Sequence, residues 1–127
     1  MELVEAEIVL LSEAEGGRIS PLSQEAFGGT YRPHIVVGNP DQREAIVEVT
    51  EDHPRTLTEK YQGVAFMRGP DLAYLPINEC IRIELALMYY PNNEYSDVVK
   101  NTTFTLREAS TIVGYGKIIR RWNEENT

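Results

Sequence analysis

Two short segments carry the residues best suited to recognise a phosphate or a carboxylate. They are Glu15-Gly16-Gly17-Arg18 and Tyr31-Arg32-Pro33. An arginine guanidinium holds either anion through two parallel hydrogen bonds, so Arg18 and Arg32 are candidates for binding or for locking two loops together. Paired glycines turn the chain sharply, because they adopt positive φ or admit a close backbone. The pattern therefore predicts that Gly16 and Gly17 place Arg18 at the rim of a sheet.

Residue types and spacing do not predict a catalytic centre or a metal site. Ser20 and Ser23 precede His34, but no Gly-x-Ser-x-Gly turn surrounds either serine. The two histidines, His34 and His53, and one cysteine are too few for a metal site. That cysteine, Cys80, stands beside an apolar strand-like run, and we expect it to be a buried core residue. The sequence thus predicts no catalytic residue, no metal and no cofactor.

Strands must position these segments, because apolar residues alternate with polar ones through most of the chain. Candidate strands cover residues 4–12, 31–37, 45–50, 61–67, 81–89, the region around 104–106, and 111–121. The expected inward residues are clearest in two of them: Val4, Ala6, Ile8 and Leu10, and Ile81, Ile83, Leu85, Leu87 and Tyr89. Closure removes unpaired edges, so we expect an all-β fold, a closed antiparallel barrel of six to seven strands. The 127 residues form one domain in this interpretation, with a disordered tail at about residues 123–127.

Two further features bear on the shape of this barrel. Gly114 and Gly116 lie two residues apart in the last strand, so they share one face and permit a bend or a close backbone contact. Between Arg18 and Thr30 a long loop is expected. Its residues 24–29 could cover whatever the Gly16-Gly17 turn presents.

Charge restricts the partners. The chain has 20 acidic and 12 basic residues, a net charge of −8, which disfavours nonspecific binding to phosphate backbones and anionic membranes. The first residues have no basic segment followed by a long apolar run, so we expect a cytoplasmic protein without a signal peptide or membrane anchor.

Several motifs, in this order, resemble the C-terminal β-barrel, domain III, of bacterial translation elongation factor Tu. They are residues 6–12, Glu15-Gly16-Gly17-Arg18, Ser20-Pro21, Tyr31-Arg32-Pro33, residues 63–67 with Gly69-Pro70, residues 104–108, and residues 111–116. In that family the barrel packs on two other domains, contacts the T-arm of aminoacyl-tRNA and takes part in binding the exchange factor. The resemblance implies that recognition could be inherited by Gly16, Gly17, Arg18, Tyr31, Arg32, Glu108 and Thr111. It does not extend to the GTPase domain, since no phosphate-binding Gly-x-x-x-x-Gly-Lys-Ser/Thr loop exists, and we expect no guanine nucleotide binding.

Three functions stay open at this level. The first is a non-enzymatic binding module that has kept the barrel and engages a protein partner. The second is binding of tRNA or the translation machinery through the barrel rim. The third is an enzyme with a site built from the inserted loops around Ser23, His34 and His53. Beside any binding role, Arg18 and Arg32 could each be held by a carboxylate such as Glu15 or Glu108, which would lock loops rather than meet a partner.

Overall fold

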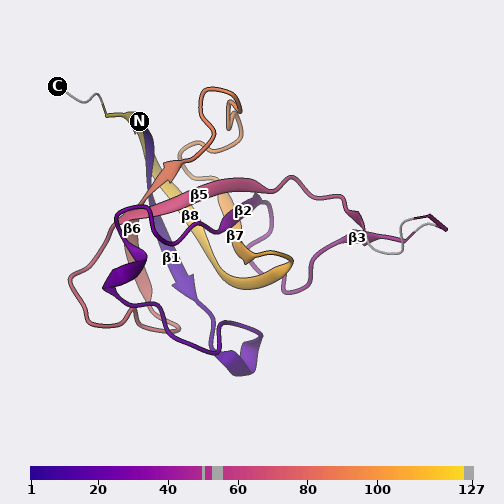
Figure 1. The fold of residues 1–127 in the computed structure, drawn as a ribbon, viewed down its shortest axis with the longest axis horizontal. Coiled ribbons are helices and arrows are strands. Elements are labelled where there is room, and N and C mark those ends of the chain that lie inside the picture. Colours follow the sequence, from indigo (N-terminus) through magenta and orange to yellow (C-terminus); the bar gives the residue numbers. More distant parts are fainter. Residues whose placement is uncertain (50, 53–55, 125–127) are drawn as a thin grey trace.

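The structure, a computed structural model, describes residues 1–49, 51–52 and 56–124, and within them six strands close into an antiparallel barrel (Figure 1). The strands follow one another around the barrel in the order β1-β6-β5-β2-β7-β8. Their bounds are β1 Glu2–Leu10, β2 His34–Val37, β5 Gln62–Arg68, β6 Cys80–Leu87, β7 Thr103–Glu108 and β8 Thr111–Asn123. The predicted all-β closed barrel is therefore confirmed. Among the described residues, no helix has the length and apolar character needed to cross a membrane.

The predicted alternation in β1 and β6 fills the barrel core. All eight aliphatic side chains expected to face inward in these two strands are buried: Val4, Ala6, Ile8, Leu10, Ile81, Ile83, Leu85 and Leu87. On the outer face, Glu5 accepts hydrogen bonds from Arg82 and Arg120. The two strands pair directly, with Ala6 opposite Ile83, so their inward residues lie side by side.

A close approach between β1 and β8 explains the two glycines of the last strand. Gly116 lies opposite Ile8, and a Cβ added there would fall 2.2 Å from the carbonyl oxygen of Glu7 and 2.7 Å from the Phe104 ring. Gly114 meets the Val9 carbonyl oxygen in the same way, at 2.7 Å. The expected close backbone contact is confirmed, and it lets Phe104 occupy the space beside Gly116.

The strand predicted over residues 45–50 lies outside the barrel. Only Val47–Glu48 forms a strand, β3, which pairs with β4 (Thr56–Leu57) in a separate two-stranded sheet, and residue 50 is outside the described part of the chain. Together with the segments leading to and from them, these strands make an arm, the described residues within 39–61, that extends away from the barrel in Figure 1. Alternation indicated a half-buried strand but could not identify which sheet it joins.

Three smaller expectations also require correction. Cys80 is exposed, because inward Ile81 is its neighbour and successive side chains of a strand point to opposite faces. Tyr89 follows the end of β6 and is exposed rather than inward. Asn123 still belongs to β8 and lies opposite Glu2, so the proposed disordered tail does not begin there; residues 125–127 are not described.

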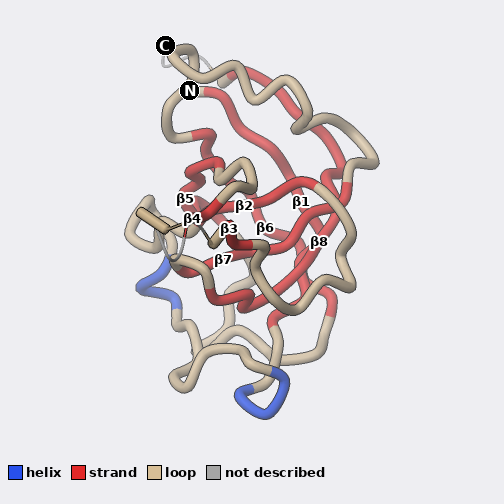
Figure 2. The backbone as a smooth tube through the Cα atoms, turned by 90° about the vertical axis from the view of Figure 1, so that its right-hand side faces the viewer, coloured by secondary structure: helices blue, strands red, loops and turns tan. Residues whose placement is uncertain are grey.

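Loops close the two ends of the barrel. Figure 2 places the N-terminus at one end and the 3-10 helix η1 (Glu13–Glu15), in blue, at the opposite end. Near η1, the loop between β1 and β2, which contains the second 3-10 helix η2 (Gln24–Ala26), contributes Leu22 and Ala26 to the core. The loop between β5 and β6 adds Leu75. Ala26, with Phe27 packed against the core, thus helps to cover the barrel, whereas a covering of the Gly16-Gly17 turn by residues 24–29 stays a prediction.

Candidate functional site

Arg18, Tyr31 and Glu108 meet at the loop-covered end of the barrel. Glu108 lies at the end of β7. One of its carboxylate oxygens forms an ion pair with Arg18 and accepts a hydrogen bond from the Tyr31 hydroxyl. The Arg18 guanidinium also lies over the Tyr31 ring, 5.4 Å from its centroid, and its Nε donates to the Ser20 carbonyl oxygen at 2.9 Å. The three residues come from three segments, and their contacts join these segments into one unit.

This cluster is only partly exposed, which strengthens its electrostatics. The side chains of Arg18 and Glu108 are 29% and 33% exposed. Burial raises the pKa of the Tyr31 hydroxyl, and the hydrogen bond to Glu108 raises it further, so the hydroxyl stays a protonated donor. Burial alone would lower the pKa of Arg18, but the hydrogen bond and the charge of Glu108, together with the Tyr31 hydroxyl, outweigh burial and the pKa is raised. Fixed protonation states suit a locked structural cluster rather than proton transfer.

The other predicted residues take different positions at this end. Gly16 has a φ of 94° at the end of η1, and Gly17 packs so tightly on the Leu11 carbonyl that a Cβ would lie 2.2 Å from its oxygen. Thr111 begins β8 opposite Glu108. Arg32 is exposed and donates from Nε to the Gly29 carbonyl oxygen at 2.8 Å, within its own loop. The structure therefore brings Arg18, Tyr31, Glu108 and Thr111 together. The Arg32 side chain instead bonds within its own loop.

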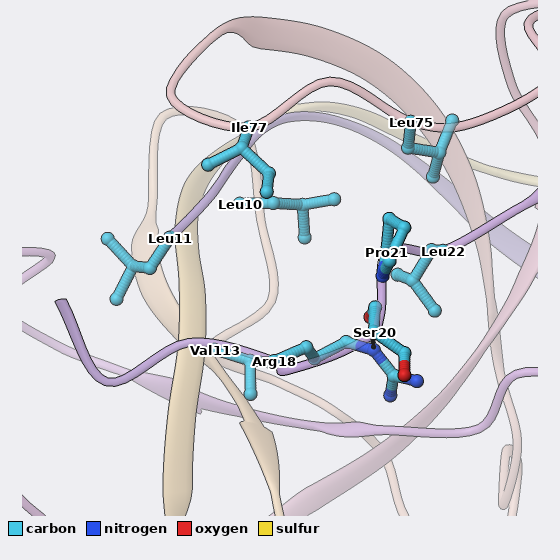
Figure 3. Close-up of a pocket in the computed structure, with 9 residues that line it drawn as sticks. All are labelled: Leu10, Leu11, Arg18, Ser20, Pro21, Leu22, Leu75, Ile77 and Val113. Atoms are coloured by element: carbon cyan, nitrogen blue, oxygen red, sulfur yellow. Dashed lines mark hydrogen bonds between the residues drawn. The ribbon is translucent and has the colours of Figure 1, made fainter. Parts of the chain in front are cut away.

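A small apolar pocket lies beside the Arg18 side chain. Figure 3 shows Leu10 and Leu11 between Ile77 of one loop and Arg18 and Ser20 of the other. The space inside is about 10 Å³, roughly what one water molecule needs. A pocket of this size does not hold a metabolite.

The outer surface at this end carries a group of exposed apolar side chains that sequence reasoning missed. We define the loop patch as Ile19, Leu72, Tyr74 and Ile77, whose exposed fractions are 81%, 43%, 63% and 42%. Their loops are hydrogen-bonded to each other. The Leu75 amide donates to the Leu22 carbonyl oxygen at 2.7 Å, and Ser23 and Tyr74 form an isolated antiparallel β-bridge. The Gln24 amide group adds bonds to the carbonyl oxygens of Pro70 and Leu72.

Two of the three residues considered for an enzymatic site, Ser23 and His34, contact different neighbours. The Ser23 hydroxyl accepts a bond from the Glu25 amide at 3.3 Å, while His34 packs edge-on against Tyr61, with ring centroids 6.1 Å apart. His53 is outside the described residues. Within the described part of the chain, no three histidine, cysteine, aspartate or glutamate side chains are grouped to hold a metal ion. In the same part, every buried side-chain polar atom has a hydrogen-bond partner.

No protein-family model and no curated protein matches this sequence. The resemblance to domain III of elongation factor Tu therefore stays a prediction.

Proposed function

We propose that this protein is a non-enzymatic binding module that engages a protein partner through the loop patch. One observation carries the proposal: four large apolar side chains stand exposed on two loops that are hydrogen-bonded to each other and anchored in the barrel core. Large apolar side chains left exposed on neighbouring loops are a feature of protein interaction sites. Preformed loops lower the entropy lost on binding, and the exposed tyrosine Tyr74 supplies a rigid aromatic contact.

Charge around the loop patch indicates the character of the partner. The two loops carry exposed Glu25, Asp71 and Glu79. Of their two basic residues, Arg18 is paired with Glu108, and exposed Arg32 is bonded to the Gly29 carbonyl oxygen. Complementary charge speeds association and excludes wrong partners. We therefore expect a partner whose apolar contact residues are surrounded by lysine or arginine.

The same contacts give less support to tRNA binding. A phosphate would have to displace the Glu108 carboxylate from Arg18, in a protein of net charge −8. The proposal keeps a relation to the elongation factor Tu barrel as a hypothesis, supported by the motif order and by the closed six-stranded barrel. In that hypothesis the barrel is retained and the partner has changed.

Affinity purification from native cells with matched variants tests the proposal. The double variant Ile19→Ser, Tyr74→Ser removes two contacts of the loop patch, and Tyr89→Ser removes an exposed tyrosine elsewhere. We expect a discrete protein to copurify with the unmodified chain and with Tyr89→Ser but not with the double variant. Calorimetry with that purified protein should then show binding weakened about tenfold or more by the double variant. Equal recovery with all three baits, or recovery of tRNA alone, would contradict the proposal, and equal thermal melts would show that the variants fold.

A further inference from the structure

A buried ion pair ties the base of the arm to the barrel. Arg107 of β7 is fully buried, and its two terminal nitrogens donate to the two carboxylate oxygens of Glu59, at 2.6 and 3.0 Å. The same carboxylate accepts bonds from the Ile46 amide at 2.7 Å and from the Gln42 side chain at 3.0 Å. These bonds join both segments of the arm to the barrel wall. These hydrogen bonds therefore hold the base of the arm against the barrel wall.

A groove lies between the base of the arm and the turn that joins β7 to β8. Its volume is about 400 Å³. The arm contributes Arg43, Glu44, Ala45 and Val47 to its lining, and the rest of the lining is Gly16, Ser110, Thr111 and Ile112. Ala45 and Val47 are half-buried, and Val49, two residues further, is 72% exposed. These three residues form an apolar row at the spacing of one strand face. Ile46, on the opposite side, is exposed and does not line the groove.

The backbone of the arm offers a second binding feature. Within the described residues, β3 pairs only with β4, so its other edge has no neighbouring strand. A free edge presents amide and carbonyl groups that an extended segment can pair with, and side chains of that segment then enter pockets at alternate positions. The groove has the size to take such side chains, and Ala45, Val47 and Ile112 give it an apolar part among polar lining residues.

Charge identifies the occupant as basic. Residues 39–61 contain six acidic and three basic residues, a net charge of −3. Of the basic residues, Arg43 lies over the Tyr115 ring and donates to the Pro40 and Gln42 carbonyl oxygens, and Lys60 is near Asp97; the third, Arg55, is outside the described residues. Glu44 and Glu48 are exposed along the arm. A second copy of this chain, with its own charge of −8, would be repelled.

We propose that the groove between the arm and the β7–β8 turn binds an extended, lysine- or arginine-bearing segment of a partner protein, which adds as a strand to β3. Alternate apolar side chains of that segment enter the groove beside Ala45 and Val47. Its basic side chains face Glu44 and Glu48. This inference concerns a surface distinct from the loop patch and does not rest on it.

Titration of the full-length, isotope-labelled protein with short model peptides tests the inference. The probe is a blocked octapeptide of alternating valine and lysine, and the matched control alternates valine and glutamate. We expect the lysine peptide to shift the amide resonances of Ala45, Val47 and Thr111 saturably. The glutamate peptide should not shift them, and methylation of alternate backbone nitrogens of the lysine peptide should abolish binding because strand pairing needs those donors.

Variants separate the groove from other sites. Ala45→Trp fills the groove and should weaken peptide binding about tenfold, whereas Ile46→Ser on the opposite side should leave it within about twofold. The double variant of the loop patch should bind the peptide normally. Shifts that map elsewhere, no saturable shift, or unchanged binding by Ala45→Trp would overturn the inference. So would a dimer in sedimentation velocity that Ala45→Trp dissociates, since the occupant would then be a second copy.

Discussion

Arg107 and Glu59, 48 residues apart in the sequence, form a two-point contact that ties the arm to the barrel. The Arg107 side chain is completely buried and that of Glu59 is 10% exposed. The Arg107 guanidinium also donates hydrogen bonds to the hydroxyl groups of Tyr61 and Thr105, at 2.9 and 3.0 Å. A buried guanidinium with this many partners is strongly destabilising when its counter-charge is removed, because the remaining charge stays desolvated.

The first prediction is that Glu59 makes stability depend on pH in the acid range. The hydrogen bond from Arg107 lowers the pKa of Glu59 to about 2, against a partial opposing effect of burial. The folded pKa is thus below the ordinary value of 4.5. The unfolded chain takes up the proton first as pH falls, so this contribution is full above about pH 4.5 and is lost between about pH 4.5 and 2. The loss should amount to about 3 kcal/mol.

Urea unfolding of the wild type and Glu59→Gln at several pH values checks this prediction. At pH 7 the variant should be less stable by about 3 kcal/mol, and its stability should change less than that of the wild type between pH 4.5 and 2. Glu79→Gln, at an exposed position, is the control for removing one carboxylate and should follow the wild type. Parallel curves for the wild type and Glu59→Gln would show that the pair does not have this role.

The burial of Arg107 also shows where sequence reasoning stops. Period-two alternation correctly predicted the inward residues of β1 and β6, because each strand has one face in the core and the signal is local. By the same alternation Arg107, next to inward Leu106, belongs on the outside. It is buried there because the arm covers it from a distant part of the chain, and no local pattern contains that information.

The candidate site was predictable to a similar extent. The alternative in which a carboxylate holds Arg18 is present in the structure, with Glu108 as the partner, because the loop and the β7–β8 turn meet at one barrel end. The corresponding expectation for Arg32 is wrong in detail, since its Nε bonds the Gly29 carbonyl oxygen. The loop patch escaped prediction because an apolar residue in a loop gives no periodic signal that separates buried Leu75 from exposed Tyr74.

The second prediction tests the barrel core on β6. Ile83 is 1% exposed, and Ile83→Asp would bury an unpaired carboxylate, so the domain should lose about 4 kcal/mol or more and unfold at room temperature. Cys80→Asp introduces the same residue on the exposed face of the same strand and should cost about 0.5 kcal/mol or less. Thermal melts by circular dichroism compare the two. An unchanged melt for Ile83→Asp would refute the assignment of the inward face.

The third prediction concerns the single cysteine. Because Cys80 is exposed in the folded protein, its thiol should react with Ellman's reagent completely and without a lag under native conditions. Adding denaturant should accelerate the reaction only slightly. If the thiol reacts only after unfolding, the original expectation of a buried Cys80 is right and the outward register at the start of β6 is wrong. The Cys80→Ser variant, which has no thiol, gives the background signal of the assay.

The fourth prediction separates a locking role of Arg18 from RNA recognition. Arg18→Ala removes the ion pair with Glu108, its contact with the Tyr31 ring and the bond to Ser20, and should lower stability by about 1–2 kcal/mol. Arg32→Ala removes a bond to the Gly29 carbonyl oxygen at an exposed site and should change stability by about 0.5 kcal/mol or less. A double-mutant cycle with Glu108→Gln should give a coupling of about 0.5 kcal/mol or more, because the two side chains are in direct contact.

Fluorescence anisotropy with labelled aminoacyl-tRNA completes this test. With Arg18 occupied by Glu108 and a net charge of −8, the unmodified protein should bind the tRNA weakly or not at all at physiological salt, so neither alanine variant should have binding to lose. If the protein has inherited tRNA recognition from the elongation factor Tu barrel, we expect the opposite results. Each variant would then weaken a tight, salt-sensitive complex and reduce its salt dependence by about one counterion, with the melting temperature nearly unchanged. That result would identify the barrel rim as an RNA surface and would remove the case for a protein partner at this end of the molecule.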